Sequence, residues 1–166
     1  MAVIGIDPGT ASTGFGIIKE TSGSQLELLD YGVIRTPPED LPEIRLLSLY
    51  GQLKKLLDKY KPETSAVENL FFQRNVKTAM SVGQARGVIL LALSESRIPV
   101  YEYNPMDVKQ AVAGYGRADK HQVQEMVKTL MRLPDLPKPD DAADALAVAI
   151  CHINSHKLKR LYNDHG

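Results

Sequence analysis

Four acidic residues at the ends of apolar segments are the residues of this chain most suited to chemistry. Asp7 ends the run AVIGID, Glu68 ends a second run in SAVENLFF, and Asp141 and Asp144 begin the segment DDAADALAVAI. An isolated charge removed from water is very costly, so such carboxylates must be paired, hydrated or bound to a cation. An all-oxygen set of ligands suits a hard ion such as Mg²⁺, which keeps some of its waters for a substrate. The four acids therefore predict metal-assisted phosphate chemistry.

Each acid also has a structural interpretation that the sequence leaves open. Asp7 could simply open the turn Asp-Pro-Gly by bonding to the backbone beyond it. Glu68 could face solvent, because alternate residues of a strand point to opposite faces. Asp141 and Asp144 share one side of a helix, where they could be solvated and gain about 0.3–1 kcal/mol each from the helix dipole. Asp140 is better explained as a cap or first-turn acid than as a metal ligand.

Aromatic and basic residues that follow Glu68 are candidates for binding nucleic acid. Phe71 precedes the polar stretch QRNVK, which contains Arg74 and Lys77. A ring in that position is a plausible base-stacking platform, although core packing is the simpler interpretation for the neighbouring Phe72.

A second basic group surrounds the flexible loop GYG at 114–116 and consists of Lys109, Arg117 and Lys120. Such a cluster is usually a solvated face, but beside a carboxylate–metal site it is what a phosphate backbone requires. The small residues PGTASTG after Asp7 could likewise present backbone amides to a phosphate.

The composition is that of an ordinary globular protein. Its 166 residues predict one domain, residues 1–166, with a short polar tail from about 155. Twenty basic residues balance twenty acidic ones, so the net charge gives no argument for a nucleic-acid partner. The single cysteine, Cys151, cannot form an internal disulfide and is expected in the core. We see no leader sequence and no apolar run of membrane-spanning length, which predicts a soluble, cytoplasmic protein without a membrane partner.

Hydrophobic periodicity and turn signals predict a mixed α/β fold. The expected strands are 2–7, 14–20, 26–36, 64–70 and 98–103, and the expected helices are 43–60, 76–96, 105–113, 119–133 and 140–161. Short turns between the first three strands indicate an antiparallel meander, and the later strand–helix–strand order indicates parallel strands. We therefore expect a five-stranded mixed sheet flanked by helices.

Small residues recur every four positions on the helix expected at 76–96, at Ala79, Gly83 and Gly87. Each glycine costs about 1 kcal/mol relative to alanine in a helix interior, so something should compensate. Close approach of another backbone is the simplest explanation. The sequence does not say whether that backbone belongs to the sheet, to another helix or to a second copy of the chain.

Taken in order, these residues closely resemble the RuvC-type Holliday junction resolvases over nearly the whole chain. The matching stretches are GIDPGTASTGFGII, VENLFFQRNVKTAMSVGQARG, NPMDVKQAVAGYGRADKHQVQEMV and PDDAADALAVAICH. The resemblance implies a ribonuclease-H-like fold, a homodimer and Mg²⁺-dependent symmetric nicking of four-way DNA junctions in recombination and repair. It also implies a branch-migration helicase complex of the RuvA and RuvB type as a partner.

The resemblance also suggests roles for individual residues. Asp7, Glu68, Asp141 and Asp144 resemble the family's catalytic carboxylates, although some members place histidine where this chain has Asp141. They would hold two Mg²⁺ ions about 3.5–4 Å apart, for which Mn²⁺ can substitute, and water would attack the phosphodiester in line. The DNA-contacting residues expected are Phe71, as the base-stacking aromatic, with Arg74, Lys77, Lys109, Arg117 and Lys120. Lys120 is in addition a candidate for stabilising charge on the phosphate.

Two other functions share some of these sequence features. The motif D-P-G-T-x-x-T-G also looks like the phosphate loop of actin-like sugar kinases, but those enzymes need two such domains and a second glycine-rich motif. A relative that binds branched nucleic acid without cutting it is the other alternative. The intact set of four acids argues against it.

Overall fold

The computed structural model of the chain describes residues 1–69 and 75–163. Within them the strands are β1 (Ala2–Asp7), β2 (Ser12–Glu20), β3 (Leu26–Arg35), β4 (Thr64–Glu68) and β5 (Val100–Tyr103). The helices are α1 (Pro42–Tyr60), α2 (Val76–Glu95), α3 (Pro105–Ala113), α4 (Lys120–Met131) and α5 (Asp140–Asn163). Phe71, Phe72 and Arg74 lie outside the described residues.

The element order is confirmed, and the differences are at element ends. β2 begins at Ser12, before the glycine that was expected to start it. β5 begins at Val100 rather than at residue 98, and Pro99 just before it has no amide hydrogen to donate to a ladder. α5 continues to Asn163, so much of the polar tail expected from about 155 is helical.

The strand order in the sheet is β3-β2-β1-β4-β5. β1, β2 and β3 pair antiparallel, whereas β4 is parallel to β1 and β5 is parallel to β4. The expected meander and the expected parallel strands are therefore both confirmed. Because β1 and β4 are parallel neighbours, their carboxyl ends meet at one edge of the sheet, and this brings Asp7 close to Glu68.

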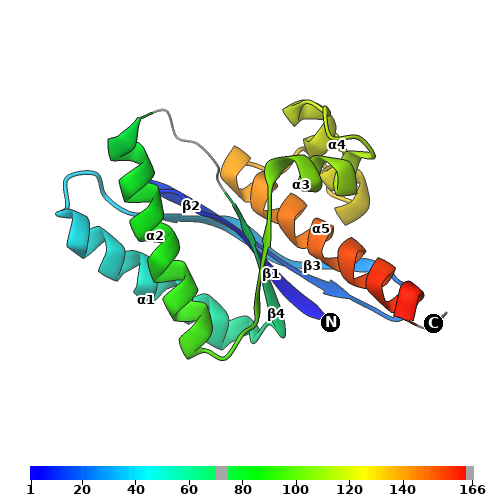
Figure 1. Ribbon diagram of the computed structural model, residues 1–166, viewed down its shortest axis with the longest axis horizontal. Helices are drawn as coiled ribbons and strands as arrows, with labels where there is room; N and C mark the ends of the chain where they lie inside the picture. The colour runs from blue at the N-terminus through cyan, green and yellow to red at the C-terminus, as the bar shows by residue number, and fades with distance from the viewer. Residues whose placement is uncertain (70–74, 164–166) are drawn as a thin grey trace.

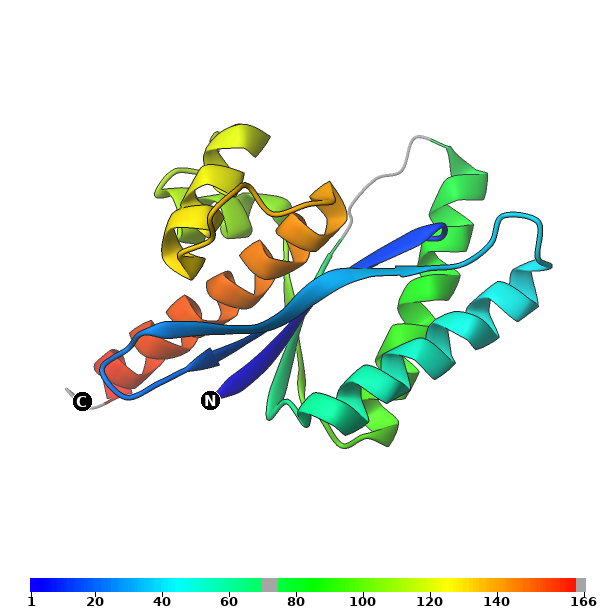
Figure 2. The same cartoon turned by 180° about the vertical axis from the view of Figure 1, so that it is seen from behind.

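Helices cover both faces of the sheet (Figures 1 and 2). α1 and α2 pack on one face over a core that includes Ile4, Ile6 and Ile89. α5 crosses the other face, with α3 and α4 packed against it, over a core that includes Leu146 and Ile150. Cys151 is 1% exposed in this second core, as expected.

α2 differs from α5 in that one of its sides is exposed. Val76, Met80 and Leu91 are each more than half exposed, and Gly83 and Gly87 are exposed as well. By length and composition alone α2 could cross a membrane, although no apolar run of membrane-spanning length was expected. A single such helix is weak evidence for a membrane span.

Candidate active site

Glycines in the sheet allow the first turns of α5 to lie directly against β1 and β2. A Cβ added to Gly14 would lie 1.9 Å from the carbonyl oxygen of Asp141, and one added to Gly5 would lie 2.1 Å from that of Ala145. Any other residue at these positions would push the helix away. Gly14 is also paired with Asp7 in the β1–β2 register, so the same contact brings the α5 acids to the end of β1.

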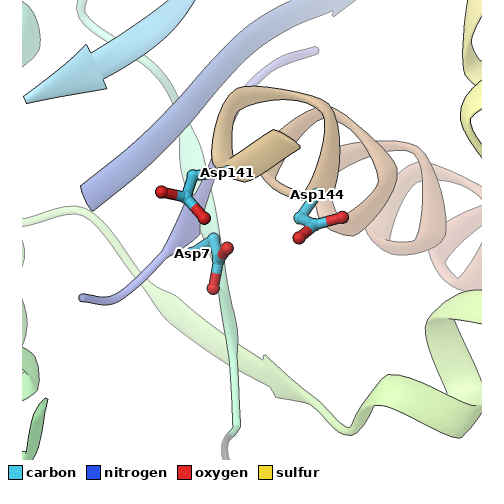
Figure 3. Close-up of side chains that lie close together, drawn as sticks. All are labelled: Asp7, Asp141 and Asp144. Atoms are coloured by element: carbon cyan, nitrogen blue, oxygen red, sulfur yellow. The ribbon is translucent and has the colours of Figure 1, made fainter. Parts of the chain in front are cut away.

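The carboxylates of Asp7, Asp141 and Asp144 converge at this point (Figure 3). Each offers an oxygen, and these oxygens all lie within 4.8 Å of one another. Asp141 and Asp144 are each partly buried, so neither is a fully solvated acid on an open helix face. Asp140 is exposed and turns away to Lys120 and Gln124, at 3.2 and 3.0 Å, which agrees with its interpretation as a first-turn acid.

Glu68 joins this cluster through Asp7. Glu68 is partly buried at the end of β4, and its carboxyl lies close enough to Asp7 for each group to shift the pKa of the other, so Glu68 does not simply face solvent. Burial, followed by the proximity of Glu68, Asp144 and Asp141, raises the pKa of Asp7 to about 9. Burial also raises the pKa of Glu68 and of Asp144, although nearby lysines oppose the rise. Asp7 therefore favours its protonated form near neutral pH unless a cation compensates the charge of the cluster.

The donor set fits a hard divalent cation. All four side chains contribute oxygen only, and a divalent ion would remove the repulsion that raises the pKa of Asp7. Asp7 is close both to Glu68 and to the two α5 acids, so it connects the members of this set.

Lys109 and Lys120 lie beside the acids, as expected. With Glu68 and Asp144 they line a cavity of about 210 Å³. A capping box formed by Asp119 and Gln122 fixes the start of α4, where Lys120 is the first residue. The Lys120 ammonium lies 3.6 Å from the Asp144 carboxylate.

The other basic residues are placed differently. Lys77 lines a separate cavity of about 320 Å³ between α1 and α2, and Arg117 is exposed on the loop between α3 and α4. Phe71 and Arg74 lie outside the described residues. Of the four predicted DNA-contacting residues that the structure describes, Lys109 and Lys120 lie with the acids, and Lys77 and Arg117 do not.

The loop after Asp7 bonds to itself. The Thr13 hydroxyl donates to the Gly9 carbonyl at 2.9 Å, and the Gly9 amide donates back at 3.4 Å. This amide is thus used internally instead of being offered to a phosphate.

Sequence reasoning missed Arg45, which ties the same loop to the end of β3. Its guanidinium donates to the Thr10 carbonyl at 3.2 Å and to the Thr36 hydroxyl at 3.0 Å. No local signal could have found it, because an arginine on an amphipathic helix is ordinary.

Comparison with known proteins agrees with this geometry. The family model of the crossover junction endodeoxyribonuclease RuvC matches residues 3–152. A protein of that name from Roseiflexus sp. (strain RS-1) is 59% identical over 149 residues, which cover 90% of this chain and 88% of that protein. Its counterpart from Halothermothrix orenii is 52% identical over the full length of both chains.

Solved structures give the same result. The Thermus thermophilus RuvC in complex with a Holliday junction substrate is 38% identical, has a TM-score of 0.92, and is matched over 96% of both chains. The yeast mitochondrial Holliday junction resolvase Ydc2, at 16% identity and a TM-score of 0.73, shares the fold. The sequence, the ribonuclease-H-like fold and the acidic site agree, and this chain is a nuclease that belongs to the RuvC family of crossover junction endodeoxyribonucleases.

Proposed function

We propose that this protein resolves four-way DNA junctions by paired, symmetric nicks in recombination and DNA repair, as a cytoplasmic Mg²⁺-dependent endonuclease. The observation that carries the proposal is the convergence of Asp7, Asp141 and Asp144, joined by Glu68, beside two lysines. The structural relative from Thermus thermophilus, which was solved with a Holliday junction, supports the same substrate for this chain.

The four acids would hold the metal, and their roles follow from their positions. Two bound Mg²⁺ ions would supply an activated water and stabilise the leaving oxygen of the phosphodiester. Asp7 would help to hold the metal, because it is close both to Glu68 and to the acids of α5. Lys120, which lies beside Asp144, would approach the phosphate and balance its charge. Lys109, which lines the same cavity, would contact the DNA backbone.

A homodimer would present two such sites to the paired strands of a junction. A Cβ added at Gly83 or Gly87 would meet no described atom of the same chain within 4 Å, so these two glycines do not serve close packing within the described chain. Of the three partners that the sequence left open, a second copy therefore fits best, and it would also cover the exposed Val76, Met80 and Leu91. We also propose coupling to a branch-migration complex of the RuvA and RuvB type, on the family resemblance alone.

A cleavage assay on three substrates of shared sequence tests the proposed function. With Mg²⁺ present, the protein should nick a four-way junction in two opposing strands and leave the matching duplex and single strand largely intact. Chelation of the metal should stop the reaction. Comparable cleavage of duplex and junction would rule out structure selectivity, and junction binding without any nicking would favour the binding-only alternative.

We expect Phe71 to hold a junction strand unpaired while its phosphate enters the acidic site. Base stacking on an aromatic ring contributes about 1–3 kcal/mol per base. Phe71→Ala should therefore lose most cleavage of a fully paired junction, by about tenfold or more, and recover on a junction that is mismatched at the cut. Phe71→Tyr, which keeps the stacking face, should remain active. Equal losses on paired and mismatched junctions, with an unchanged Tm, would contradict the stacking role.

A further inference from the structure

Arg86 of α2 connects three elements near the acidic site. Its Nη1 group donates to the main-chain carbonyl of Glu68 at 3.0 Å, and its Nη2 group forms an ion pair with Glu102 of β5. The Arg86 side chain is only 19% exposed. One guanidinium therefore holds the last residue of β4 and its neighbour strand to a helix on one face of the sheet.

The carbonyl that Arg86 holds lies where the sheet stops supporting β4. The register between β1 and β4 ends at the pair Ile6 and Val67, one residue before Glu68. On the other side, β5 still pairs Tyr103 with Glu68, and the Tyr103 carbonyl accepts the amide of Asn69 at 2.8 Å. The backbone of Glu68 thus has strand support on one side, and Arg86 supplies a further anchor where β1 no longer does.

We propose that Arg86, braced by Glu102, is a positioning residue that fixes the backbone of Glu68 and so aims its carboxylate at Asp7 and the metal. This inference rests on the proposed metal-dependent nuclease function. Arg86 contacts the main-chain oxygen of Glu68, so its role is to position the strand end. The two terminal nitrogens of the Arg86 guanidinium can bind the Glu68 carbonyl and the Glu102 carboxylate at the same time, whereas a lysine has a single ammonium group.

The same contact connects the site to the proposed dimer helix. Arg86 lies on α2 immediately before Gly87 and three residues after Gly83, both of which belong to the exposed small-residue stripe. A shift of α2 at the interface would therefore move the Glu68 carbonyl through Arg86. Each acidic site would in this way be sensitive to the position of the helix that meets the second copy.

Single-turnover cleavage at saturating junction separates positioning from DNA binding. Arg86→Ala should lower the cleavage rate by about 10–100-fold, the range for residues that orient metal ligands, with a junction Kd within about twofold of wild type. Arg86→Lys should recover little, and Glu102→Ala should give a smaller loss in the same direction. Mn²⁺ titration without DNA should show weaker binding for Arg86→Ala.

Glu95→Gln is the matched control, because Glu95 also joins α2 to a neighbouring element, through Lys54 and Tyr50 of α1. It should keep the wild-type cleavage rate and Mn²⁺ affinity. The proposal is overturned if Arg86→Ala cleaves junctions and binds Mn²⁺ as the wild type does. It is also overturned if Glu95→Gln loses as much cleavage rate and Mn²⁺ affinity as Arg86→Ala. If Arg86→Ala does not fold, Glu102→Ala decides by the same measurements. If the wild-type protein nicks no junction, the proposed function fails, and Mn²⁺ binding still decides the role of Arg86.

Discussion

Asp7→Asn is expected to abolish junction nicking, by at least about a thousandfold, while the affinity for the junction stays near wild type. The asparagine keeps the shape of Asp7, but it removes a carboxylate that lies close to all three other acids and would help to hold the metal. Junction binding should survive because it depends on lysines and on the shape of the DNA. Cleavage in Mg²⁺ and gel-shift affinity measure the two effects separately.

The same variant should be more stable than wild type when metal is absent. Burial raises the pKa of Asp7 from 3.8 to about 9, so between these values the folded chain holds a proton that the unfolded chain has lost. The stability of the metal-free wild type should therefore fall as the pH rises through this window. Asp7→Asn removes the cost of ionising this buried carboxyl. We expect the free energy of unfolding to rise by roughly 1–3 kcal/mol at neutral pH, and this gain should disappear toward pH 4.

Urea unfolding with a chelator, at several pH values, checks this second effect. Asp58→Asn is the matched control, because Asp58 is exposed on α1 and outside the acidic cluster. It should change neither cleavage nor the pH dependence. An Asp7→Asn protein that nicks junctions near the wild-type rate would show that the metal assignment is wrong.

Gly83→Leu is expected to convert the proposed dimer into a folded monomer. The described part of the chain has open space around Gly83, so the leucine fits within one copy, and replacing a helical glycine should favour the helix by about 1 kcal/mol. Between two α2 helices in close contact, the same side chain would separate the backbones. Monomers should also nick the two opposing strands of a junction independently, because the two active sites would no longer be held together.

Sedimentation velocity and thermal unfolding measure assembly and folding in this variant. Gly51→Leu on α1 is the matched control, because a Cβ there likewise meets no described atom within 4 Å. It should remain a dimer. If Gly83→Leu is well folded and still dimeric, the small-residue stripe is not the interface.

Much of the fold could be predicted from the sequence because its signals are local. Short turns indicate the meander of β1, β2 and β3, and helical spacing indicates α1. The acids of the site were also recognisable, since a carboxylate that ends an apolar run is unusual in any fold. Element ends were less predictable, as at β5, where the ladder starts only after Pro99.

The tertiary structure decided which of these acids act together. Asp140 and Asp141 are adjacent and chemically identical, and only the packing of α5 on Gly14 turns Asp141 toward Asp7 and leaves Asp140 exposed. Arg86 had no local signal at all, because its partners Glu68 and Glu102 are distant in sequence and adjacent only across the sheet. Residue type and periodicity report local structure, whereas convergence depends on which backbones can approach one another, and that is settled only when the sheet and its helices pack.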